Sequence, residues 1–552
     1  MIFFPTGEEA GIIDRYTIEE IGVPQLVLME RAALHVAEVV AALIDNDDRY
    51  NNDDRFEDYK HRKESIRESN RKKVRILGIA ESGNNGGDAL AASRILKLKG
   101  YDVDVISIDG ISKKSEAFSQ QRILCEKAGI KIISLKNENF SLEKEINRYD
   151  YLIDGIFGVG LSREVSGVHK EVIEVINDSD IKVISVDIPS GVSADTGEIL
   201  GAAVKADITV TFGYKKKGLL FNPGQDMAGR VIVGDIGFYP DKDSEILHYT
   251  YDRSDIKKLL PQRKNDSNKG TYGRVLIVAG SENISGAAFL AGNAAYRTGA
   301  GLVKIFTHEN NRKAMETLLP EALLYFYKDF NDEAKNELEK SLNSCDTAVV
   351  GPGLSLDSNA HAIMDTIFER EVNPTLILDA DAINIIAESK ENQEKLKKLS
   401  NNNPLKRDVI LTPHMLEMAR FLADEDENPK EKVSYIKNNR SKVAINAAKD
   451  YHIILVLKDA RTFVTDPYSE RIYINITGNS GMSTGGSGDT LTGIIAGLIA
   501  GGTSSDIAAR LGVYLHGAAG DIARKKLGEH SVMARDIADN MGQVIKEISE
   551  GR

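Results

Sequence analysis

The chain has 552 residues, of which 42% are hydrophobic and 28% are charged, a composition typical of a globular protein with two or three domains. Its formal net charge of −13 argues against a general nucleic-acid-binding protein, although local basic clusters could still hold an anionic cofactor. The sequence has no run of about 18 apolar residues and no secretory pattern at its start, so we expect neither a membrane span nor secretion.

Two cysteines occur in the chain, Cys125 and Cys345. They lie far apart and form no metal-ligand spacing. We interpret them as free thiols in a reducing compartment, and we therefore expect a cytoplasmic protein.

The first 42 residues carry apolar side chains at helical spacing. From about residue 45 to residue 73 almost every residue is charged or polar, and such a composition cannot bury a core by itself. We interpret this stretch as an exposed insertion, either a solvated helix or a flexible loop. A partner-binding role stays open as the less favoured alternative.

From residue 74 onward, short apolar runs alternate with helical segments. This alternation predicts a doubly wound, mostly parallel α/β sheet of the Rossmann-like kind. Ligands of such sheets bind at the carboxyl ends of the strands. The expected strands lie at residues 74–80, 103–108, 131–135, 151–157, 183–188, 208–212 and 231–236.

A polar stretch at residues 239–268 interrupts the pattern, and we place a domain boundary near residue 248. A second alternating series follows and predicts another α/β domain. The expected domains are therefore 1–247 and 248–552. The strands expected in the second lie at residues 275–278, 302–306, 348–350, 375–378, 409–411 and 453–457.

The first strand of the N-terminal domain runs into a glycine-rich segment, Gly83-Asn84-Asn85-Gly86-Gly87-Asp88. The segment is neither the Rossmann GxGxxG fingerprint nor a P-loop. Its amides and glycines would suit a polar ligand that the backbone approaches closely. The alternative is a structural Asn-Gly turn in which Asp88 caps the following helix.

Two further strands of this domain end in an aspartate, Asp154 and Asp187. The carboxyl ends of parallel strands meet at one edge of a sheet, so these carboxylates are expected near an amide and a hydroxyl. Such hard oxygen donors could ligate a monovalent cation and orient a sugar or ring hydroxyl.

Four segments of this half, NNGGD, LIDGIFGVGL, VDIPSG and TFGYKKKG, resemble the NAD(P)H-hydrate epimerase domain in their order and spacing, over about residues 8–240. The resemblance implies a potassium ion held by Asn85, Asp154 and Ser190, and Asp187 is the candidate base. It also implies that the hydrated cofactor, NADHX or NADPHX, contacts Asn84, Asn85, Gly86, Gly87, Asp88, Gly158, Val159, Gly160, Leu161, Ser162, Arg163, Glu164, Asp187 and Lys216.

The C-terminal half contains a long glycine-rich segment at residues 478–493, GNSGMSTGGSGDTLTG. A glycine-rich turn that opens a helix exposes unpaired N–H groups at the positive end of the helix dipole, which suits a phosphate. Asp489 adds negative charge there, which is understandable if it takes a proton from a hydroxyl during phosphoryl transfer. The alternative is an ordinary helix N-cap.

Other motifs of this half stand at helix starts or strand ends: Ala287 in a Ser-Gly-Ala-Ala segment, Gly353 in Gly-Pro-Gly, and His414 in Thr-Pro-His. Small residues alone favour a structural role, and a lone histidine is usually structural as well. His414, however, lies at a strand's carboxyl end. Lys458 and Arg461 offer two cations near a predicted hairpin, which suits nucleotide phosphates.

From about residue 254 to the end, these motifs resemble the ADP- or ATP-dependent NAD(P)H-hydrate dehydratase of the ribokinase-like superfamily. The resemblance implies that the hydrated cofactor contacts Ala287, Gly353, His414 and Asp489. It also implies that the adenine nucleotide, with Mg²⁺, contacts Lys458, Asp459, Ala460, Arg461, Thr462, Gly485, Gly486 and Gly488.

The chain departs from the patterns of the two families at six positions. In the N-terminal half, Arg31 and Ala33 replace an asparagine and a glycine, and Ala89 replaces a glycine. In the C-terminal half, Ser355 in GPGLS departs from the pattern, and Leu416 and Asp459 replace glycines. Asp459 brings a carboxylate close to the expected phosphates.

Both resemblances imply the repair of NAD(P)H that carries water across a double bond of its nicotinamide ring. One domain would interconvert the R and S epimers, and the other would dehydrate the S form at the expense of ADP or ATP, with the fused arrangement leaning towards ADP. We expect small-molecule substrates, a homo-oligomer, and no nucleic-acid or membrane partner. Two alternatives stay open, a ribokinase-like kinase of a small alcohol and a non-catalytic binding scaffold.

Overall fold

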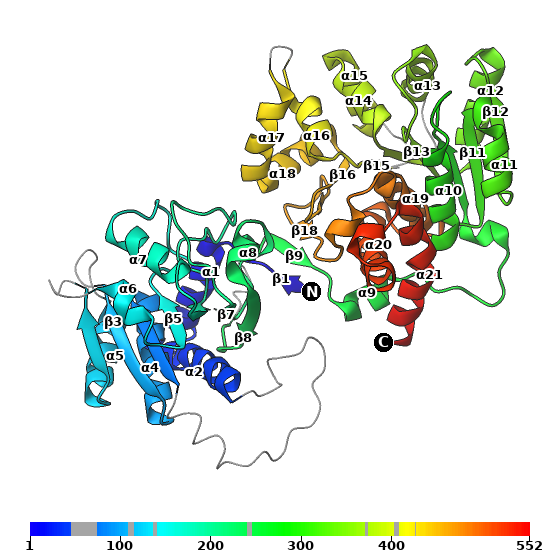
Figure 1. The fold of residues 1–552 in the computed structure, drawn as a ribbon. Coiled ribbons are helices and arrows are strands. Elements are labelled where there is room, and N and C mark those ends of the chain that lie inside the picture. The colour runs from blue at the N-terminus through cyan, green and yellow to red at the C-terminus, as the bar shows by residue number, and fades with distance from the viewer. Residues whose placement is uncertain are drawn as a thin grey trace. The chain divides into compact units, whose positions relative to one another are not determined.

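The computed structural model describes residues 1–45, 74–108, 115–135, 141–239, 246–369, 374–401, 408–424 and 427–551. The chain forms two compact units, Phe3–Ile246 and Leu247–Arg552, and Met1–Ile2 belong to the second (Figure 1). The expected insertion at residues 45–73 lies outside the described residues apart from Asp45. In the part of the chain that the structure describes, no helix is both long and apolar enough to cross a membrane.

The N-terminal unit is built on a parallel sheet with the strand order β4-β3-β2-β5-β6-β7-β8. The strands are β2 (Arg75–Ala80), β3 (Asp102–Ser107), β4 (Lys131–Ser134), β5 (Tyr151–Gly155), β6 (Lys182–Val186), β7 (Ile208–Phe212) and β8 (Arg230–Gly234). The order reverses direction between β2 and β5. Ligands of doubly wound sheets bind at such a switch point, on the carboxyl side of the strands.

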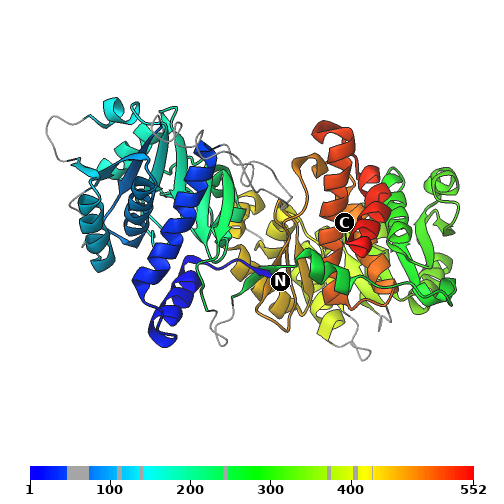
Figure 2. The ribbon, with the colours of Figure 1, turned by 90° about the horizontal axis from the view of Figure 1, so that it is seen from below.

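The helices of this unit cover both faces of the sheet. They are α1 (Gly7–Arg15), α2 (Gln25–Ile44), α4 (Asn84–Leu98), α5 (Glu116–Lys127), α6 (Leu142–Ile146), α7 (Val168–Asn177) and α8 (Gly224–Ala228), with a π-helix η1 (Tyr16–Glu20) and a 3₁₀ turn η3 (Lys217–Leu220). Figures 1 and 2 show α2 and α4 side by side. Neighbouring residues of one strand enter separate hydrophobic clusters, as Ile76 and Leu77 of β2 do. Because both faces are buried, the strands are continuously apolar, and the sequence shows them clearly.

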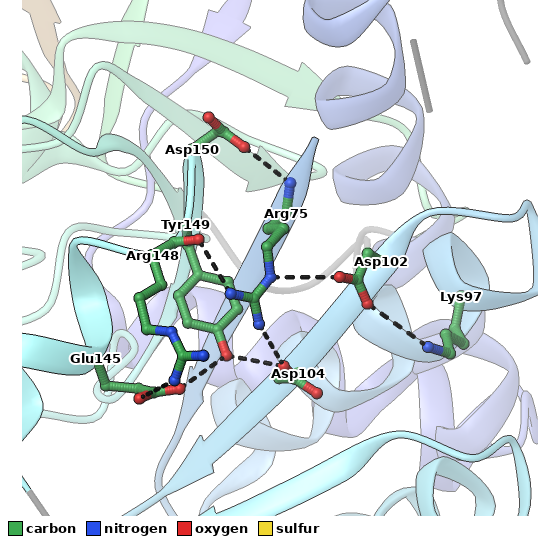
Figure 3. Close-up of polar contacts among 8 residues, drawn as sticks. All are labelled: Arg75, Lys97, Asp102, Asp104, Glu145, Arg148, Tyr149 and Asp150. Atoms are coloured by element: carbon green, nitrogen blue, oxygen red, sulfur yellow. Dashed lines mark hydrogen bonds and ion pairs between the residues drawn. The ribbon is translucent and has the colours of Figure 1, made fainter. Parts of the chain in front are cut away.

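The amino-terminal edge of this sheet is fastened by a polar cluster around Arg75 (Figure 3). The guanidinium of Arg75 lies 3.3 Å from Asp102 and 3.2 Å from Asp104, and it lies over the ring of Tyr149 at 4.4 Å. Its backbone N–H donates to Asp150 at 2.8 Å. The cluster joins β2, β3 and the segment before β5 at the edge opposite the carboxyl ends of these strands.

The C-terminal unit is built on a larger sheet with the order β1-β9-β18-β17-β16-β15-β14-β13-β10-β11-β12. The strands from β10 to β16 are parallel, and the order changes direction between β10 and β13. The antiparallel pairing of β16 with β17 confirms the predicted hairpin. The strands are β1 (Ile2–Phe3), β9 (His248–Thr250), β10 (Arg274–Val278), β11 (Leu302–His308), β12 (Leu323–Tyr327), β13 (Thr347–Val350), β14 (Thr375–Leu378), β15 (Val409–Leu411), β16 (Ile454–Leu457), β17 (Phe463–Thr465) and β18 (Ile472–Ile474).

The longer helices of this unit are α9 (Arg253–Leu259), α10 (Gly286–Thr298), α11 (Arg312–Leu318), α12 (Asp332–Ser344), α13 (Ser358–Phe368), α14 (Asp381–Ala387), α15 (Lys390–Asn401), α16 (Met415–Leu422), α17 (Pro429–Asn438), α18 (Arg440–Tyr451), α19 (Ser487–Ala500), α20 (Ser505–Leu527) and α21 (Ala534–Glu550). Short 3₁₀ turns are η4 (Lys269–Tyr272), η5 (Glu309–Asn311), η6 (Ser480–Met482) and η7 (Glu529–Ser531). The predicted fold class, two α/β domains on largely parallel sheets, is therefore confirmed.

Helix α19 packs closely against α10, and this contact positions the glycine-rich turn at its start (Figure 1). A Cβ at Gly493 would lie 2.1 Å from the carbonyl oxygen of Ala291, and a Cβ at Gly497 would lie 2.7 Å from that of Ala295. Only glycine permits this approach of the two backbones. The remainder of α19 from Thr490 onward is buried and apolar in character.

Candidate active sites

A cavity of about 570 Å³ opens at the carboxyl ends of the N-terminal strands, beside the switch point between β2 and β5. It brings together most of the residues expected to contact the hydrated cofactor: Asn84, Asn85, Asp88, Gly158, Val159, Gly160, Leu161, Ser162, Arg163, Asp187 and Lys216. Glu164 is exposed and does not line this cavity.

The NNGGD segment forms the start of helix α4, which begins at Asn84, earlier than the sequence indicated. Gly83 occupies the N-cap position, so Asp88 is not a helix cap. Gly86 and Gly87 face the interior: a Cβ would lie 1.7 Å from the carbonyl oxygen of Glu81 at the first and 2.7 Å from Met29 at the second. These two glycines let the helix start fit under the cavity rather than lining it.

Asp154, at the end of β5, is fully buried and held by donors from two strand ends. Oδ2 accepts hydrogen bonds from the Ser185 hydroxyl at 2.7 Å and the Ser190 N–H at 3.0 Å. Oδ1 accepts from the Ser190 hydroxyl at 2.5 Å and the Ile156 N–H at 3.2 Å. Burial raises the pKa of Asp154, although the hydrogen bonds from Ser190 act in the opposite direction.

The third residue expected at the cation, Asn85, comes close to the same segment. A Cβ at Gly158 would lie 3.3 Å from Asn85 Oδ1, and the Phe157 N–H donates to the Ser190 hydroxyl at 2.8 Å. The Asn85 Nδ2 atom is buried and has no hydrogen-bond partner among the described residues. Asn85, Asp154 and Ser190 therefore converge on the turn after β5, and only oxygen and amide groups meet there.

Asp187, directly after β6, is a carboxylate of the cavity that is held by three donors. Lys216 Nζ donates to Asp187 Oδ1, which also accepts from the Thr211 hydroxyl at 3.1 Å and the Phe212 N–H at 3.2 Å. The backbone of Asp187 has φ of +65°, a left-handed conformation that non-glycine residues rarely adopt. Backbone strain of this kind costs on the order of 1–3 kcal/mol and is found mainly at functional sites.

The C-terminal site begins at the turn before α19. Gly486 takes φ of +88° and occupies the N-cap position, which places Asp489 inside the first helical turn rather than at the cap. Burial and the neighbouring carboxylate of Asp379 raise the pKa of Asp489 to about 6, while Lys458 acts in the opposite direction. Asp489 is thus a partly buried carboxylate at a helix start, with a pKa suited to accepting a proton.

Lys458, at the end of β16, joins Asp379 to this turn. Lys458 Nζ donates to Asp379 Oδ1 at 2.7 Å, and the Thr412 hydroxyl donates to the same oxygen at 2.7 Å. A Cβ at Gly488 would lie 3.2 Å from Lys458 Nζ, so the ammonium borders the turn. Burial disfavours its charge, yet the Asp379 and Glu417 carboxylates raise the pKa of Lys458 overall.

Comparison with known proteins covers both units. A family model described as NAD(P)H-hydrate dehydratase matches residues 275–543, and one described as YjeF-related protein N-terminus matches residues 25–218. The bifunctional NAD(P)H-hydrate repair enzyme Nnr of Moorella thermoacetica is 34% identical, over 100% of this chain and 98% of that protein. The chain belongs to this family. The Nnr of Thermofilum pendens is 32% identical, over 98% of this chain and 96% of its own length.

Solved structures similar to the chain each cover only part of it. An ADP/ATP-dependent NAD(P)H-hydrate dehydratase from Bacillus subtilis, co-crystallized with ATP/Mg²⁺, is 29% identical with a TM-score of 0.45, over 54% of this chain and 98% of that one. Membership in the bifunctional repair family accounts for both halves of the chain. It therefore replaces the two alternatives, a small-alcohol kinase and a non-catalytic scaffold.

Two of the three positions where the C-terminal unit of this repair enzyme departs from the family pattern have local explanations, and Leu416 has none. Asp459 is paired with Arg440, the first residue of α18, at 2.7 Å, so its charge does not stand alone beside Lys458. Ser355 adopts φ of +70°, a left-handed conformation that favours glycine, and its N–H donates to Asp381 at 2.8 Å.

The residues predicted to contact the hydrated cofactor in this unit, other than Asp489, lie at two places. Gly353 is adjacent to Ala287, because a Cβ on Gly353 would lie 3.1 Å from the Ala287 Cβ at the switch point between β10 and β13. His414 caps α16: its Nδ1 accepts from the Leu416 N–H at 3.1 Å, and its Nε2 lies 3.2 Å from Glu417 Oε1. Contact of Ala287, Gly353 and His414 with the hydrated cofactor stays a prediction.

Several residues that sequence reasoning missed support the two sites. Asp521 of α20 accepts from the Gly478 N–H at 3.0 Å. His516 Nε2 donates to the Ser487 carbonyl oxygen at 3.0 Å, because a carbonyl oxygen can only accept. Burial lowers the pKa of His516 to about 4, so the ring is neutral. In the N-terminal cavity, Glu81 is paired with the buried His169 at 2.7 Å. The HGAAGD segment at residues 516–521 was a usable signal for the first pair, whereas nothing in the sequence marked the second.

Proposed function

We propose that the N-terminal cavity epimerises NAD(P)H hydrate and that the turn before α19 carries the nucleotide-dependent dehydration of the S form. The chain is a bifunctional NAD(P)H-hydrate repair enzyme by family membership; the proposal assigns its two reactions to residues. The observation that carries the assignment is Asp489, whose pKa of about 6 leaves it ionised at neutral pH within a glycine-rich helix start. We assign the epimerase to residues 1–247 and the dehydratase to residues 248–552.

In the dehydratase, Asp489 would take the proton of the ring hydroxyl as the hydroxyl oxygen attacks the terminal phosphate of the nucleotide. Hydroxide is a poor leaving group, whereas a phosphate ester leaves readily with electron donation from the ring nitrogen. The N–H groups of Gly486 and Gly488 and the ammonium of Lys458 would stabilise charge that develops on the phosphate. The nucleotide leaves one phosphate shorter. Elimination of phosphate, with loss of a proton from the neighbouring ring carbon, then regenerates NAD(P)H.

A bound Mg²⁺ would neutralise part of the phosphate charge during this transfer. No group of three or more carboxylate, histidine or cysteine ligands occurs among the described residues. The Asp379 carboxylate borders the turn, since its Oδ2 would lie 3.7 Å from a Cβ at Gly488. It would fit Mg²⁺, which proteins usually hold through one or two carboxylates together with substrate phosphates and water. ADP is our preferred nucleotide, and absorbance recovery of hydrated NADH in parallel with ADP and with ATP tests the choice.

Asp459 tests the nucleotide side of this site. Asp459→Gly restores the family's glycine and removes a charge that Arg440 already balances at 2.7 Å. Partly exposed ion pairs contribute up to about 1 kcal/mol, so we expect nucleotide affinity to change by less than about fivefold. Calorimetric titration with ADP or ATP measures it. A gain of more than about tenfold would show that Asp459 acts on the phosphates as an uncompensated charge.

In the epimerase, Asp187 is our candidate base, and Lys216 would hold it in place. The convergent oxygens of Asn85, Asp154 and Ser190 fit an alkali or alkaline-earth cation better than zinc or copper, because no histidine or cysteine joins them. We propose potassium. Its charge would orient the substrate and offset the buried carboxylate of Asp154.

Asp154→Asn is expected to slow R-to-S conversion roughly tenfold or more, in the range that loss of a metal-site partner usually costs. Dehydration of the S epimer should be unchanged. Chromatographic separation of the epimers, in potassium salt and then in a large organic cation, measures the effect.

The matched control for that experiment is Ser185→Ala, which removes another donor to Asp154 but no expected cation ligand. It should keep the dependence of the wild-type rate on potassium. Equal wild-type rates in the two salts would remove the cation from the mechanism.

We further propose a cytoplasmic homo-oligomer, with NADHX and NADPHX both as substrates. Sedimentation of the purified chain tests the oligomeric state, and a monomer at working concentration would contradict it.

A further inference from the structure

Four ionisable side chains from different parts of the N-terminal unit line the cavity that we assign to the epimerase. Asp14 comes from α1, Asp88 from α4 just after its first turn, Asp187 from the end of β6, and Lys216 from the segment after β7. If all four were charged, the cavity would hold two uncompensated negative charges. That arrangement would repel the phosphates of a dinucleotide.

The three carboxyl groups have different surroundings. Asp187 accepts from Lys216, Thr211 and the Phe212 N–H. Within the described residues, neither Asp14 nor Asp88 accepts a hydrogen bond at its carboxyl group from another side chain or from the backbone. Two carboxyl groups thus line the cavity without a protein donor, and a third, Asp187, has three.

Burial and neighbouring charges favour the protonated form of Asp88 and of Asp14. Burial, then the charges of Asp187 and Asp14, raise the pKa of Asp88 well above its usual value, and Lys216 only partly offsets this. Burial and Asp187 also raise the pKa of Asp14, against the influence of Arg15 and Lys216. Carboxyl groups that share a site in this way keep a proton among them. Glu81 and Arg163 also line the cavity.

We propose that Asp88 is the proton donor of epimerisation, opposite the base Asp187, and that Asp14 is the positioning residue that keeps the proton on Asp88. The inference rests on the proposed epimerase function of this cavity. It adds an acid to a site for which the sequence indicated only a base.

Epimerisation proceeds by loss of water from the ring and its return to the other face. Asp88 gives its proton to the ring hydroxyl as the bond between carbon and oxygen breaks, and water leaves with the bonding electrons. The ring nitrogen lone pair forms a double bond to the same carbon. Water then adds to the opposite face, Asp187 takes its proton, and the electron pair returns to nitrogen. Asp88 and Asp187 end with exchanged protonation states, which suits the reverse conversion and resets through solvent.

Asp88→Asn tests the proton donor in the full-length enzyme. We expect kcat for R-to-S conversion to fall at least about a hundredfold, because general acids contribute roughly that much. KM should change little, and incorporation of ¹⁸O from labelled water into the ring hydroxyl should fall in parallel. A residue that only binds substrate would raise KM and keep kcat.

Asp14→Asn tests the positioning role through the pH profile. The active form needs protonated Asp88, so the wild-type rate should fall as pH rises through the pKa of Asp88. Removing the negative charge of Asp14 lowers that pKa, and the alkaline limb should therefore move to lower pH by roughly one unit. Glu8→Gln, an exposed carboxylate of the same helix, is the matched control and should leave the profile in place.

These experiments test the proposed epimerase function and the roles of Asp88 and Asp14 separately. A wild-type enzyme that does not interconvert the epimers overturns the proposed function itself. An active wild type with an active Asp88→Asn variant, or with an Asp14→Asn profile that superimposes on that of Glu8→Gln, overturns the inference alone. Circular dichroism of each variant establishes that it is folded before rates are compared.

Discussion

Asp489→Asn is expected to lower nucleotide-dependent dehydration by at least about a hundredfold and to leave R-to-S conversion unchanged. The substitution keeps the size of the side chain but removes the base that would accept the hydroxyl proton, and general-base catalysis is worth roughly that factor. Nucleotide binding should survive, because the glycine-rich turn and Lys458 are retained. The measurement follows absorbance recovery of hydrated NADH, with epimerisation in the same sample as the internal control. Dehydration above about one hundredth of the wild-type rate would contradict the assignment.

The pH dependence of the wild-type enzyme gives an independent test of the same residue. Because the pKa of Asp489 is raised to about 6, the carboxyl is protonated and inactive below this pH and ionised above it. The dehydration rate should therefore rise with pH through about 6 and then level off. A rate that stays constant from pH 5 to 8 would assign the proton to another group.

Lys458→Met is expected to abolish nucleotide-dependent dehydration and to destabilise the C-terminal unit by about 3 kcal/mol. Asp379 is 1% exposed, and the substitution leaves its carboxylate buried without the ammonium that pairs with it. Breaking a buried pair by removing one partner costs roughly this much. Calorimetric unfolding measures the stability, and titration with ADP or ATP measures the lost affinity.

The double variant Asp379→Asn with Lys458→Met separates the two effects. It removes both charges and retains a hydrogen-bonding group for Thr412, so most of the stability should return. Nucleotide affinity should not return, because no ammonium borders Gly488. Full recovery of affinity in the double variant would limit Lys458 to a structural role.

Residues with a local pattern could be predicted from the sequence. The central strands were apparent because both of their faces are buried, whereas β9, β12 and β18 were not among the expected strands. The motifs placed Asp187 and Asp489 at strand and helix ends. The sequence did not indicate that the NNGGD segment belongs to the helix that follows it. Helix α4 begins at Asn84, because Gly86 and Gly87 permit contacts with Glu81 and Met29 that no local rule reveals.

Long-range pairings could not be predicted from one sequence. Asp14 lies in an ordinary amphipathic helix, and only the folded unit brings it to the cavity with Asp187. The pairing of Asp459 with Arg440 likewise joins a hairpin to a helix start, and it answers a question that the sequence left open. In both cases the decisive quantity is a distance across the fold, which sequence separation does not indicate.

The close contact of α10 and α19 has a consequence for how this protein tolerates mutation. Gly493 lies four residues beyond Asp489, about 6 Å along the helix axis, and its backbone abuts Ala291. Any side chain at this position would push the helix away and carry the glycine-rich turn with it. In a survey of random substitutions, Gly493 and Gly497 should therefore score as severely as the base itself, although neither would touch a substrate. Substitutions there would abolish activity because they displace the glycine-rich turn, and a higher nucleotide concentration would not restore the activity.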